Sequence, residues 1–102
     1  MKVSVIVPTF NCAATIRETL DSILGQSRPA EEILVMDDGS TDETMAILKG
    51  YGSNIRTFRQ SNAGPSRARG ALIEVARGDL IAFVDSDDIW HPDYLRAQQA
   101  LA

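Results

Sequence analysis

The stretch Leu80-Ile81-Ala82-Phe83-Val84, followed at once by Asp85-Ser86-Asp87-Asp88, decides how the rest of the chain is interpreted. A short apolar run of this kind is typical of a strand buried in a sheet. Unpaired carboxylates cannot continue into an apolar layer, so the chain must leave the sheet at Asp85. Three carboxylates within four residues repel one another, and a hard divalent cation relieves that repulsion because it prefers oxygen ligands. The pattern favours a metal site that shares a phosphate, and an acidic surface turn is the alternative.

Strand and helix patterns alternate along the whole chain. Alternation of this kind predicts an α/β fold with a mainly parallel sheet and right-handed crossovers. We expect the strand order 3-2-1-4 in this sheet. The expected strands are residues 3–7, 33–36, 55–59 and 80–84. The expected helices have apolar faces within Ile16 to Leu24, at Ile47 and Leu48, within Ala68 to Ala76, and within Tyr94 to Leu101.

Local signals set the expected boundaries of these elements. We expect Pro8 to stop the first strand, because proline cannot donate a ladder hydrogen bond. Ser40-Thr41-Asp42-Glu43 has the spacing of a capping box, which predicts that a helix starts there. Gly50 and Gly52 are expected to end that helix, and Gly78 to cap the next one. Pro92 suits the first position of the last helix.

The predicted sheet brings three polar segments to one edge. In a doubly wound sheet, ligands bind beyond the carboxyl ends of the strands, at the switch point. With the order 3-2-1-4, that point collects Pro8-Thr9, Asp37-Asp38 and the acidic segment 85–88. This convergence favours one site over unrelated acidic turns. We expect one of Asp37 and Asp38 to cap the Gly39-Ser40 turn, and the other to accept hydrogen bonds from ribose hydroxyls or a base N–H.

Two arginines near the start of the third predicted helix are candidate phosphate ligands. Arg67 and Arg69 follow Gly64-Pro65 closely. A guanidinium can fork onto phosphate oxygens, and a helix N-terminus adds partial positive charge. The alternative for each arginine is a solvated position on the helix surface.

Composition excludes several classes of function. The chain has 102 residues, enough for one small domain, and a net charge of −4, which argues against nucleic acid as a partner. The G-x-G-x-x-G and P-loop patterns are absent, and one cysteine with one histidine cannot build a zinc site. Cys12 cannot form an internal disulfide, which suggests a reducing compartment. We expect a cytoplasmic protein, with attachment to the inner face of the membrane as an alternative, and no segment approaches the roughly 20 apolar residues of a membrane span.

Four motifs follow one another along the chain. They are Val3 to Asn11, Asp37-Asp38-Gly39-Ser40-Thr41-Asp42, Asn62-Ala63-Gly64 through Ala68-Arg69, and Gly78 to Asp88. In this order they resemble the motifs of family 2 glycosyltransferases. The resemblance implies the glycosyltransferase A fold, a Rossmann-like three-layer αβα domain that binds a nucleotide sugar. It also implies transfer of a sugar from a nucleotide diphosphate to an acceptor hydroxyl, with inversion and usually with Mn²⁺ or Mg²⁺.

The resemblance implies roles for individual residues in nucleotide binding. Pro8 and Thr9 would line the base pocket, and Asp38, with Asp37 beside it, would contact the base and ribose. Arg69 stands where the family often has an arginine near the nucleotide. The chain departs from the family pattern at the next position, because Gly70 stands where asparagine is common.

The same resemblance assigns the acidic segment. Asp85 stands at the first aspartate of the family's D-x-D motif, near the ribose, and Ser86 beside it is counted with the nucleotide-binding residues. Asp87 stands at the second aspartate, on the metal, with Asp88 assisting through water. The predicted metal set is therefore Asp87, Asp85 and Asp88.

The resemblance also implies what the chain lacks. In this family the acceptor half follows the D-x-D strand, so we expect the general base beyond Ala102 and a truncated, donor-binding part here. A UDP-sugar is the expected donor, with GDP and dTDP as alternatives, and the expected acceptor is a saccharide or a lipid-linked acceptor. We also expect an apolar patch beside the fourth strand and self-association into a homo-oligomer.

Two other functions stay open at this point. Asp37-Asp38 resembles the acidic pair of a receiver domain, with Asp85 as the phosphorylated residue, but no lysine follows Lys49 and the pair is on the wrong strand. The second alternative is a non-catalytic nucleotide-sugar-binding domain. Activity of this segment compared with that of the full-length protein would separate it from an enzyme.

Overall fold

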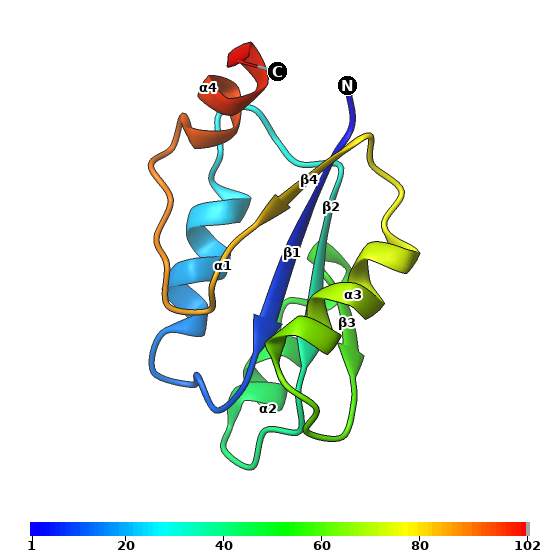
Figure 1. Ribbon diagram of the computed structural model, residues 1–102. Coiled ribbons are helices and arrows are strands. Elements are labelled where there is room, and N and C mark those ends of the chain that lie inside the picture. The colour runs from blue at the N-terminus through cyan, green and yellow to red at the C-terminus, as the bar shows by residue number, and fades with distance from the viewer. Residues whose placement is uncertain (102) are drawn as a thin grey trace.

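The computed structural model describes residues 1–101 and alternates strands with helices (Figure 1). In chain order the elements are β1 (Val3–Thr9), α1 (Ile16–Leu24), β2 (Glu32–Asp37), α2 (Thr44–Lys49), the 3₁₀ turn η1 (Gly52–Asn54), β3 (Arg56–Arg59), α3 (Pro65–Val75), β4 (Leu80–Phe83) and α4 (Tyr94–Leu101).

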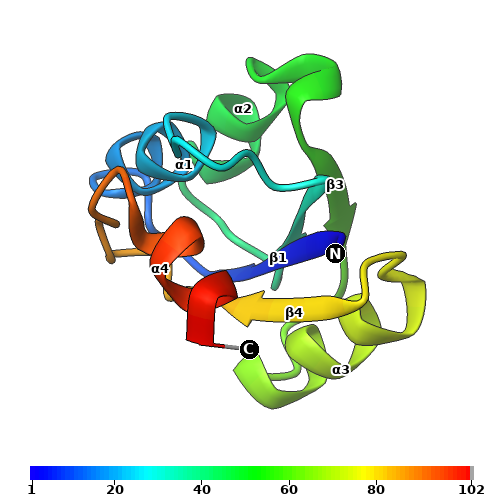
Figure 2. The same cartoon turned by 90° about the horizontal axis from the view of Figure 1, so that it is seen from above.

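The four strands form one parallel sheet in the order β3-β2-β1-β4, which confirms the predicted topology. Val5 of β1 lies opposite Ile33 of β2 on one side and opposite Ala82 of β4 on the other. The first strand is therefore central, and all of its residues are buried. Seen from above, helices cover the sheet on both sides, α1, α2 and α4 on one and α3 on the other (Figure 2). The predicted three-layer αβα architecture is present.

Alternation along β1 divides the core into two parts. Val5 and Val7 pack with Ile16 and Leu20 of α1, in a cluster that also includes residues of α2 and α4. Ile6 faces the other way, into a smaller cluster formed with residues of β2 and α3. Successive side chains of a strand point to opposite faces, so a central strand covered on both sides must be apolar at nearly every position. This explains the almost continuous apolar run at the start of the sequence.

The prediction that Pro8 ends the first strand was wrong. Pro8 pairs with Met36, and the strand continues to Thr9. The backbone of Ile6 faces β4, since its carbonyl accepts a hydrogen bond from Val84 N at 3.1 Å. Two residues further on, the nitrogen of Pro8 faces the same side, beyond the end of β4 at Phe83. No ladder hydrogen bond is lost there, so proline is tolerated in a central strand.

Two further boundary predictions, at Ser40 and Gly78, were wrong because both residues make contacts with distant parts of the chain. The helix expected at Ser40 begins at Thr44, and the Ser40 hydroxyl is bonded to Asp37 and Asn11 instead of capping it. Gly78 is not a helix cap, since α3 ends at Val75. A Cβ at Gly78 would lie 2.6–2.9 Å from atoms of Lys2 and Ser4, so the close approach of the first strand requires glycine there.

The expectations for Gly50 and Pro92 had different outcomes. Gly50 is the C-cap of α2, as predicted, and Gly52 opens the following 3₁₀ turn with a positive φ of 55°. Pro92 is not the first residue of the last helix, which begins at Tyr94. Its carbonyl accepts a hydrogen bond from Ser27 N, which fixes the turn before α4 against the end of α1.

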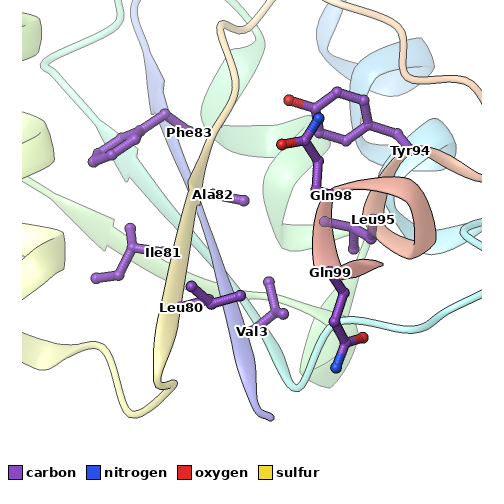
Figure 3. Close-up of a pocket in the computed structure, with 9 residues that line it drawn as sticks. All are labelled: Val3, Leu80, Ile81, Ala82, Phe83, Tyr94, Leu95, Gln98 and Gln99. Carbon is purple, nitrogen blue, oxygen red and sulfur yellow. The ribbon is translucent and has the colours of Figure 1, made fainter. Parts of the chain in front are cut away.

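The fourth strand is less buried than its apolar sequence suggests. It lies at the edge of the sheet, and Phe83 is 50% exposed. A hollow of about 460 Å³ separates β4 from α4 (Figure 3). Leu80 and Ala82 point toward α4 in this view, and Ile81 and Phe83 point away. The expected apolar patch beside the fourth strand is therefore present, whereas the self-association inferred from it stays a prediction.

Two glycines offer a matched test of backbone packing. We expect Gly78→Ala to lower the free energy of unfolding by about 1–3 kcal/mol, because backbone atoms of the first strand occupy the space. Gly70→Ala should raise it by about 0.5–1 kcal/mol, because Gly70 lies inside α3 with nothing within 4 Å of the added carbon. Urea denaturation of both variants measures the difference, and equal stability of the two would contradict this packing.

Candidate functional site

The carboxyl ends of β1 and β2 and the segment after β4 meet around a cavity of about 240 Å³. Arg69 of α3 and Asp85, which follows β4, approach one another at this cavity. Six of the predicted nucleotide-binding residues line this cavity, so the predicted convergence is present. The lining residues are Pro8, Thr9, Phe10, Asp38, Pro65, Arg69, Asp85 and Ser86.

Phe10 and Pro65 were not predicted as site residues. Phe10 is an aromatic side chain that is 49% exposed directly after a buried strand. Its position after Pro8-Thr9 could have indicated a ligand-facing aromatic residue. Pro65 is the first residue of α3, and it lines the cavity because the preceding Gly64 turns the chain with a positive φ of 96°.

An ion pair links α3 to the segment after β4 at the cavity. Arg69 Nη2 lies 3.1 Å from Asp85 Oδ1. Both side chains are partly exposed, so this pair adds little to stability and can exchange partners readily. Arg67, the second candidate arginine, is exposed on α3 and does not line the cavity. Of the two candidate arginines, Arg69 therefore lies at the cavity and Arg67 has the solvated position on the helix surface that was its alternative.

The buried carboxylate of Asp38 orders one wall of the cavity. It accepts hydrogen bonds from Gln60 Nε2 at 2.8 Å, Ala63 N at 2.8 Å, Gly64 N at 3.0 Å and Asn62 Nδ2 at 3.4 Å. The hydrogen bond from Gln60 holds the pKa of Asp38 below its ordinary value, although burial acts in the opposite direction. The loop held in this way leads into α3 and Arg69, so Asp38 positions that wall as well as lining it.

Asp37 performs the turn-capping role expected of one member of the pair. It is fully buried and accepts hydrogen bonds from the side chain and backbone N–H of Ser40. Arg59 Nε lies 3.6 Å from Asp37 Oδ2, the oxygen that also accepts the hydrogen bond from Ser40 N. Asp37 does not line the cavity and supports the site from behind.

A left-handed residue that the sequence did not reveal ties together two loops of the site. Asn11 has a φ of 47°, which asparagine tolerates better than most residues. Its side-chain oxygen accepts hydrogen bonds from Thr41 N and Asp42 N, and its own N–H donates to Ser40 Oγ. Phe10, next to Asn11, is thereby held at the cavity.

The acidic segment forms a tight turn whose carboxylates do not converge. Asp88 N donates to Asp85 O at 3.0 Å, and Asp88 Oδ2 accepts from Asp85 N at 3.2 Å, so the Asp88 side chain is turned back on the turn. Asp85, Asp87 and Asp88 are all exposed. Among residues 1–101, no three His, Cys, Asp or Glu side chains gather closely enough to hold a metal ion. The Asp88 side chain therefore serves the turn and the carboxylates form no preformed cage, whereas the assignment of Asp87, Asp85 and Asp88 to a metal stays a prediction.

The donor set nevertheless fits a metal that is shared with another ligand. Carboxylate oxygens suit Mg²⁺ and Mn²⁺, and such ions commonly take one or two carboxylates together with phosphate oxygens. Asp85 faces the cavity and Asp87 is exposed beside it. An ion here would need oxygen ligands from a bound molecule.

The family model described as "Glycosyl transferase family 2" matches residues 4–102. The chain belongs to glycosyl transferase family 2. The expected resemblance is confirmed, and the receiver-domain alternative is wrong, because the match covers all three segments that meet at the cavity.

Curated relatives of the chain are glycosyltransferases of greater length. The chain is 40% identical to the uncharacterized glycosyltransferase YibD of Escherichia coli, over 99% of this chain and 30% of that protein. It is 41% identical to TuaG of Bacillus subtilis, a putative teichuronic acid biosynthesis glycosyltransferase, over 94% of this chain and 40% of that protein. The chain thus spans less than half the length of these relatives.

Solved structures share the fold closely. S. aureus TarS in complex with UDP superimposes with a TM-score of 0.90 at 38% identity, over 98% of this chain and 31% of that chain. The mannosyltransferase PcManGT from Pyrobaculum calidifontis, in complex with GDP-Man and Mn²⁺, gives a TM-score of 0.82 at 30% identity, over 92% of this chain and 30% of that chain. In the part of this chain that the structure describes, no helix is long and apolar enough to cross a membrane.

The lowered pKa of Asp38 predicts acid-sensitive stability. A carboxylate whose pKa is lower in the folded state stabilises the fold above its unfolded pKa, near 3.9, and loses that contribution as the pH falls through the folded pKa. Asp38→Asn should therefore be less stable than wild type at pH 7, and the difference should shrink below about pH 4. Thermal unfolding from pH 7 to pH 2 measures this.

The exposed Asp87 gives the matched control for this titration. Asp87→Asn should unfold within a degree or so of wild type at neutral pH, because surface substitutions rarely change stability by more than about 0.5 kcal/mol. A stability difference between Asp38→Asn and wild type that stays constant down to pH 2 would contradict the role of the Asp38 carboxylate.

Proposed function

We propose that this chain is the donor-binding part of a glycosyltransferase that moves a sugar from a nucleotide diphosphate to an acceptor hydroxyl. The observation that carries the proposal is the cavity at the carboxyl edge of the sheet, across which Arg69 and Asp85 form an ion pair. Support comes from relatives with the same fold, since TarS was solved with UDP and with UDP-GlcNAc, and PcManGT with GDP-Man.

The cavity suits the base of the nucleotide. Its volume of about 240 Å³ is below the usual range for a whole drug-sized ligand, so it accommodates only part of a nucleotide sugar. Pro8, Thr9 and Phe10 offer backbone groups and an aromatic surface to a planar ring. Asp38 contacts the base or ribose from the loop wall that it orders, and Asp37 acts behind it through the Ser40 turn.

The ribose and phosphates lie beyond the cavity in this proposal. Asp85 accepts hydrogen bonds from ribose hydroxyls, and Ser86 contributes the adjoining wall. Arg69 is then free to turn toward the nucleotide, since its partly exposed pair with Asp85 is easily exchanged. A guanidinium at this position complements a phosphate oxygen better than an ammonium group would, because it offers two parallel N–H donors.

The carboxylates of the acidic turn would hold a divalent cation, Mn²⁺ or Mg²⁺. When bound, such an ion would supply Lewis-acid stabilisation of the leaving diphosphate. Asp87 is the principal protein ligand in this proposal, with Asp85 on the ribose side and Asp88 assisting through water. Support comes from PcManGT and from glucosyl-3-phosphoglycerate synthase of Mycobacterium tuberculosis, both solved with Mn²⁺.

Direct displacement with inversion also needs a general base near the acceptor hydroxyl. The carboxylates of the acidic turn are assigned to donor and metal. Asp93, the nearest alternative in the sequence, accepts a hydrogen bond from Ser27 Oγ. We therefore infer that the base belongs to a part of the protein outside residues 1–102, as does recognition of a saccharide or lipid-linked acceptor.

Two finer points belong to the same proposal. A UDP-sugar is the favoured donor, since TarS, which has the higher TM-score of the two, was solved with UDP. GDP and dTDP sugars are the alternatives, and PcManGT was solved with GDP-Man. We propose a cytoplasmic location, with attachment to the inner face of the membrane as the alternative; the free thiol of Cys12 is compatible with a reducing compartment. A non-catalytic nucleotide-sugar-binding domain is the second candidate.

Residues 1–102 alone should bind the donor but transfer little sugar. The expected result is a measurable affinity for UDP with turnover no faster than spontaneous hydrolysis of the UDP-sugar, because no base is in reach of an acceptor. Release of UDP in the presence of saccharide acceptors measures turnover. Rapid transfer by the purified segment would show that a base has been missed.

Asp87→Asn tests the metal assignment. It keeps the size of the side chain but removes its charge, so the fold should persist while metal-dependent affinity for UDP falls about tenfold or more, roughly 1.4 kcal/mol. Calorimetric titration of UDP and GDP with and without Mn²⁺ measures this affinity.

Asp93→Asn is the control for the metal assignment, since it removes an aspartate outside the proposed site and should leave nucleotide binding nearly unchanged. Equal metal-dependent binding by wild type and Asp87→Asn would remove Asp87 from the metal site. Wild type without any metal dependence would overturn the assignment of the acidic turn.

A further inference from the structure

Polar side chains along one side of α1 hold the segment after β4 by its backbone. They recur at a spacing of three and four residues, so they share one face of the helix. Their hydrogen bonds reach from Ser86 to Leu95. The pairs are Thr15 Oγ1 to Ser86 O at 2.9 Å, Thr19 Oγ1 to Ser86 O at 3.0 Å, Trp90 N to Ser22 Oγ at 3.0 Å, Gln26 Nε2 to His91 O at 2.7 Å, and Leu95 N to Gln26 Oε1 at 2.9 Å.

The carbonyl of Ser86 is held by two hydroxyls at once. Thr15 immediately precedes α1 and Thr19 lies one turn further on, so both donate to the same oxygen. The Thr19 side chain is fully buried. A threonine hydroxyl inside a helix commonly bonds a carbonyl of the preceding turn. Here it is directed outward to another segment, and the β-branched side chain restricts its rotation.

The peptide group held in this way joins Ser86 to Asp87. Fixing its carbonyl fixes the direction of the Asp87 N–H and limits where the Asp87 side chain can project. Asp85, on the other side of Ser86, is held by its two backbone hydrogen bonds to Asp88. The directions of the Asp85 and Asp87 carboxylates therefore depend on this turn. Its residue Ser86 is held by the hydroxyls of Thr15 and Thr19.

We propose that Thr15 and Thr19 are positioning residues, whose hydroxyls orient the acidic turn so that Asp85 and Asp87 engage the donor and its metal ion. This inference rests on the proposed function, and it adds two residues of the first helix to the site. Because the three carboxylates do not converge by themselves, a metal ligand set at this turn depends on how the backbone is held. Groups that orient metal ligands typically change metal affinity by about 10–100-fold when removed.

The test replaces each hydroxyl by a methyl group of similar size. Thr15→Val, Thr19→Val and the double variant are titrated with UDP, with and without Mn²⁺, and the ratio of the two dissociation constants gives the metal-dependent gain. We expect this gain to fall about tenfold in Thr19→Val and further in the double variant, while the metal-free affinity stays within about twofold. Thr19→Ser restores a hydroxyl and should keep most of the gain.

Ser22→Ala is the matched control. Ser22 holds Trp90 in the same segment, away from the acidic turn, so its loss should lower stability without changing the metal-dependent gain. Thr15 is only half-buried, so Thr15→Val provides the test even if Thr19→Val fails to fold.

Each outcome bears on one claim. An unchanged metal-dependent gain in folded Thr15→Val and Thr19→Val, with a normal gain in wild type, would overturn the positioning role and leave the proposed function intact. An equal loss of gain in Ser22→Ala would also overturn it, because general loosening of the segment would then explain the effect. The absence of any gain in wild type would overturn the metal part of the proposed function and this inference with it.

Discussion

Burial of β1 between two helical layers is the constraint on which the rest of this structure depends. Every residue of β1 is buried, and its alternate side chains enter two separate clusters. A strand in this position must pair on both edges, because unpaired backbone groups cannot be buried without a large loss of stability. The pairing with β2 and β4 follows, and with it the meeting of three distant segments at one edge of the sheet.

At that edge the aspartates divide into two that are buried and two that are exposed. Asp37 and Asp38 are buried, and their carboxylates accept hydrogen bonds from the turns and loops around them. Asp85 and Asp87 are exposed on the turn after β4. Buried carboxylates require partners and exposed ones do not, so Asp37 and Asp38 are held by neighbouring turns, Asp38 while also lining the cavity, whereas Asp85 and Asp87 stay accessible to solvent. Arg69 connects the two groups, since it lies in α3, which follows the loop ordered by Asp38, and pairs with Asp85.

The positions of the loops depend on side-chain contacts with the backbone of neighbouring segments. Asn11 bonds the β2–α2 loop, Asp38 bonds the loop before α3, and Thr15 and Thr19 bond the acidic turn. Each of these contacts spans a large separation in sequence and gives a backbone donor or acceptor of the loop a partner. Mechanistically, such contacts pre-order the cavity walls, which reduces the ordering that a ligand must impose on binding.

The sequence by itself determined the topology, the family and the edge of the sheet where the three polar segments meet. Apolar periodicity is a local property, and parallel pairing of such strands leaves few alternatives, so the order β3-β2-β1-β4 could be predicted. The tertiary structure alone decided the fate of individual polar side chains. The Ser40 hydroxyl bonds Asp37 instead of capping a helix, and the Asp88 carboxylate bonds the backbone of its own turn. The structure likewise decided that Gly78 makes room for the N-terminal segment of the chain and that Pro8 lies within β1. These outcomes depend on groups far apart in sequence competing for the same hydrogen bonds and the same space, and no local pattern of residues records that competition.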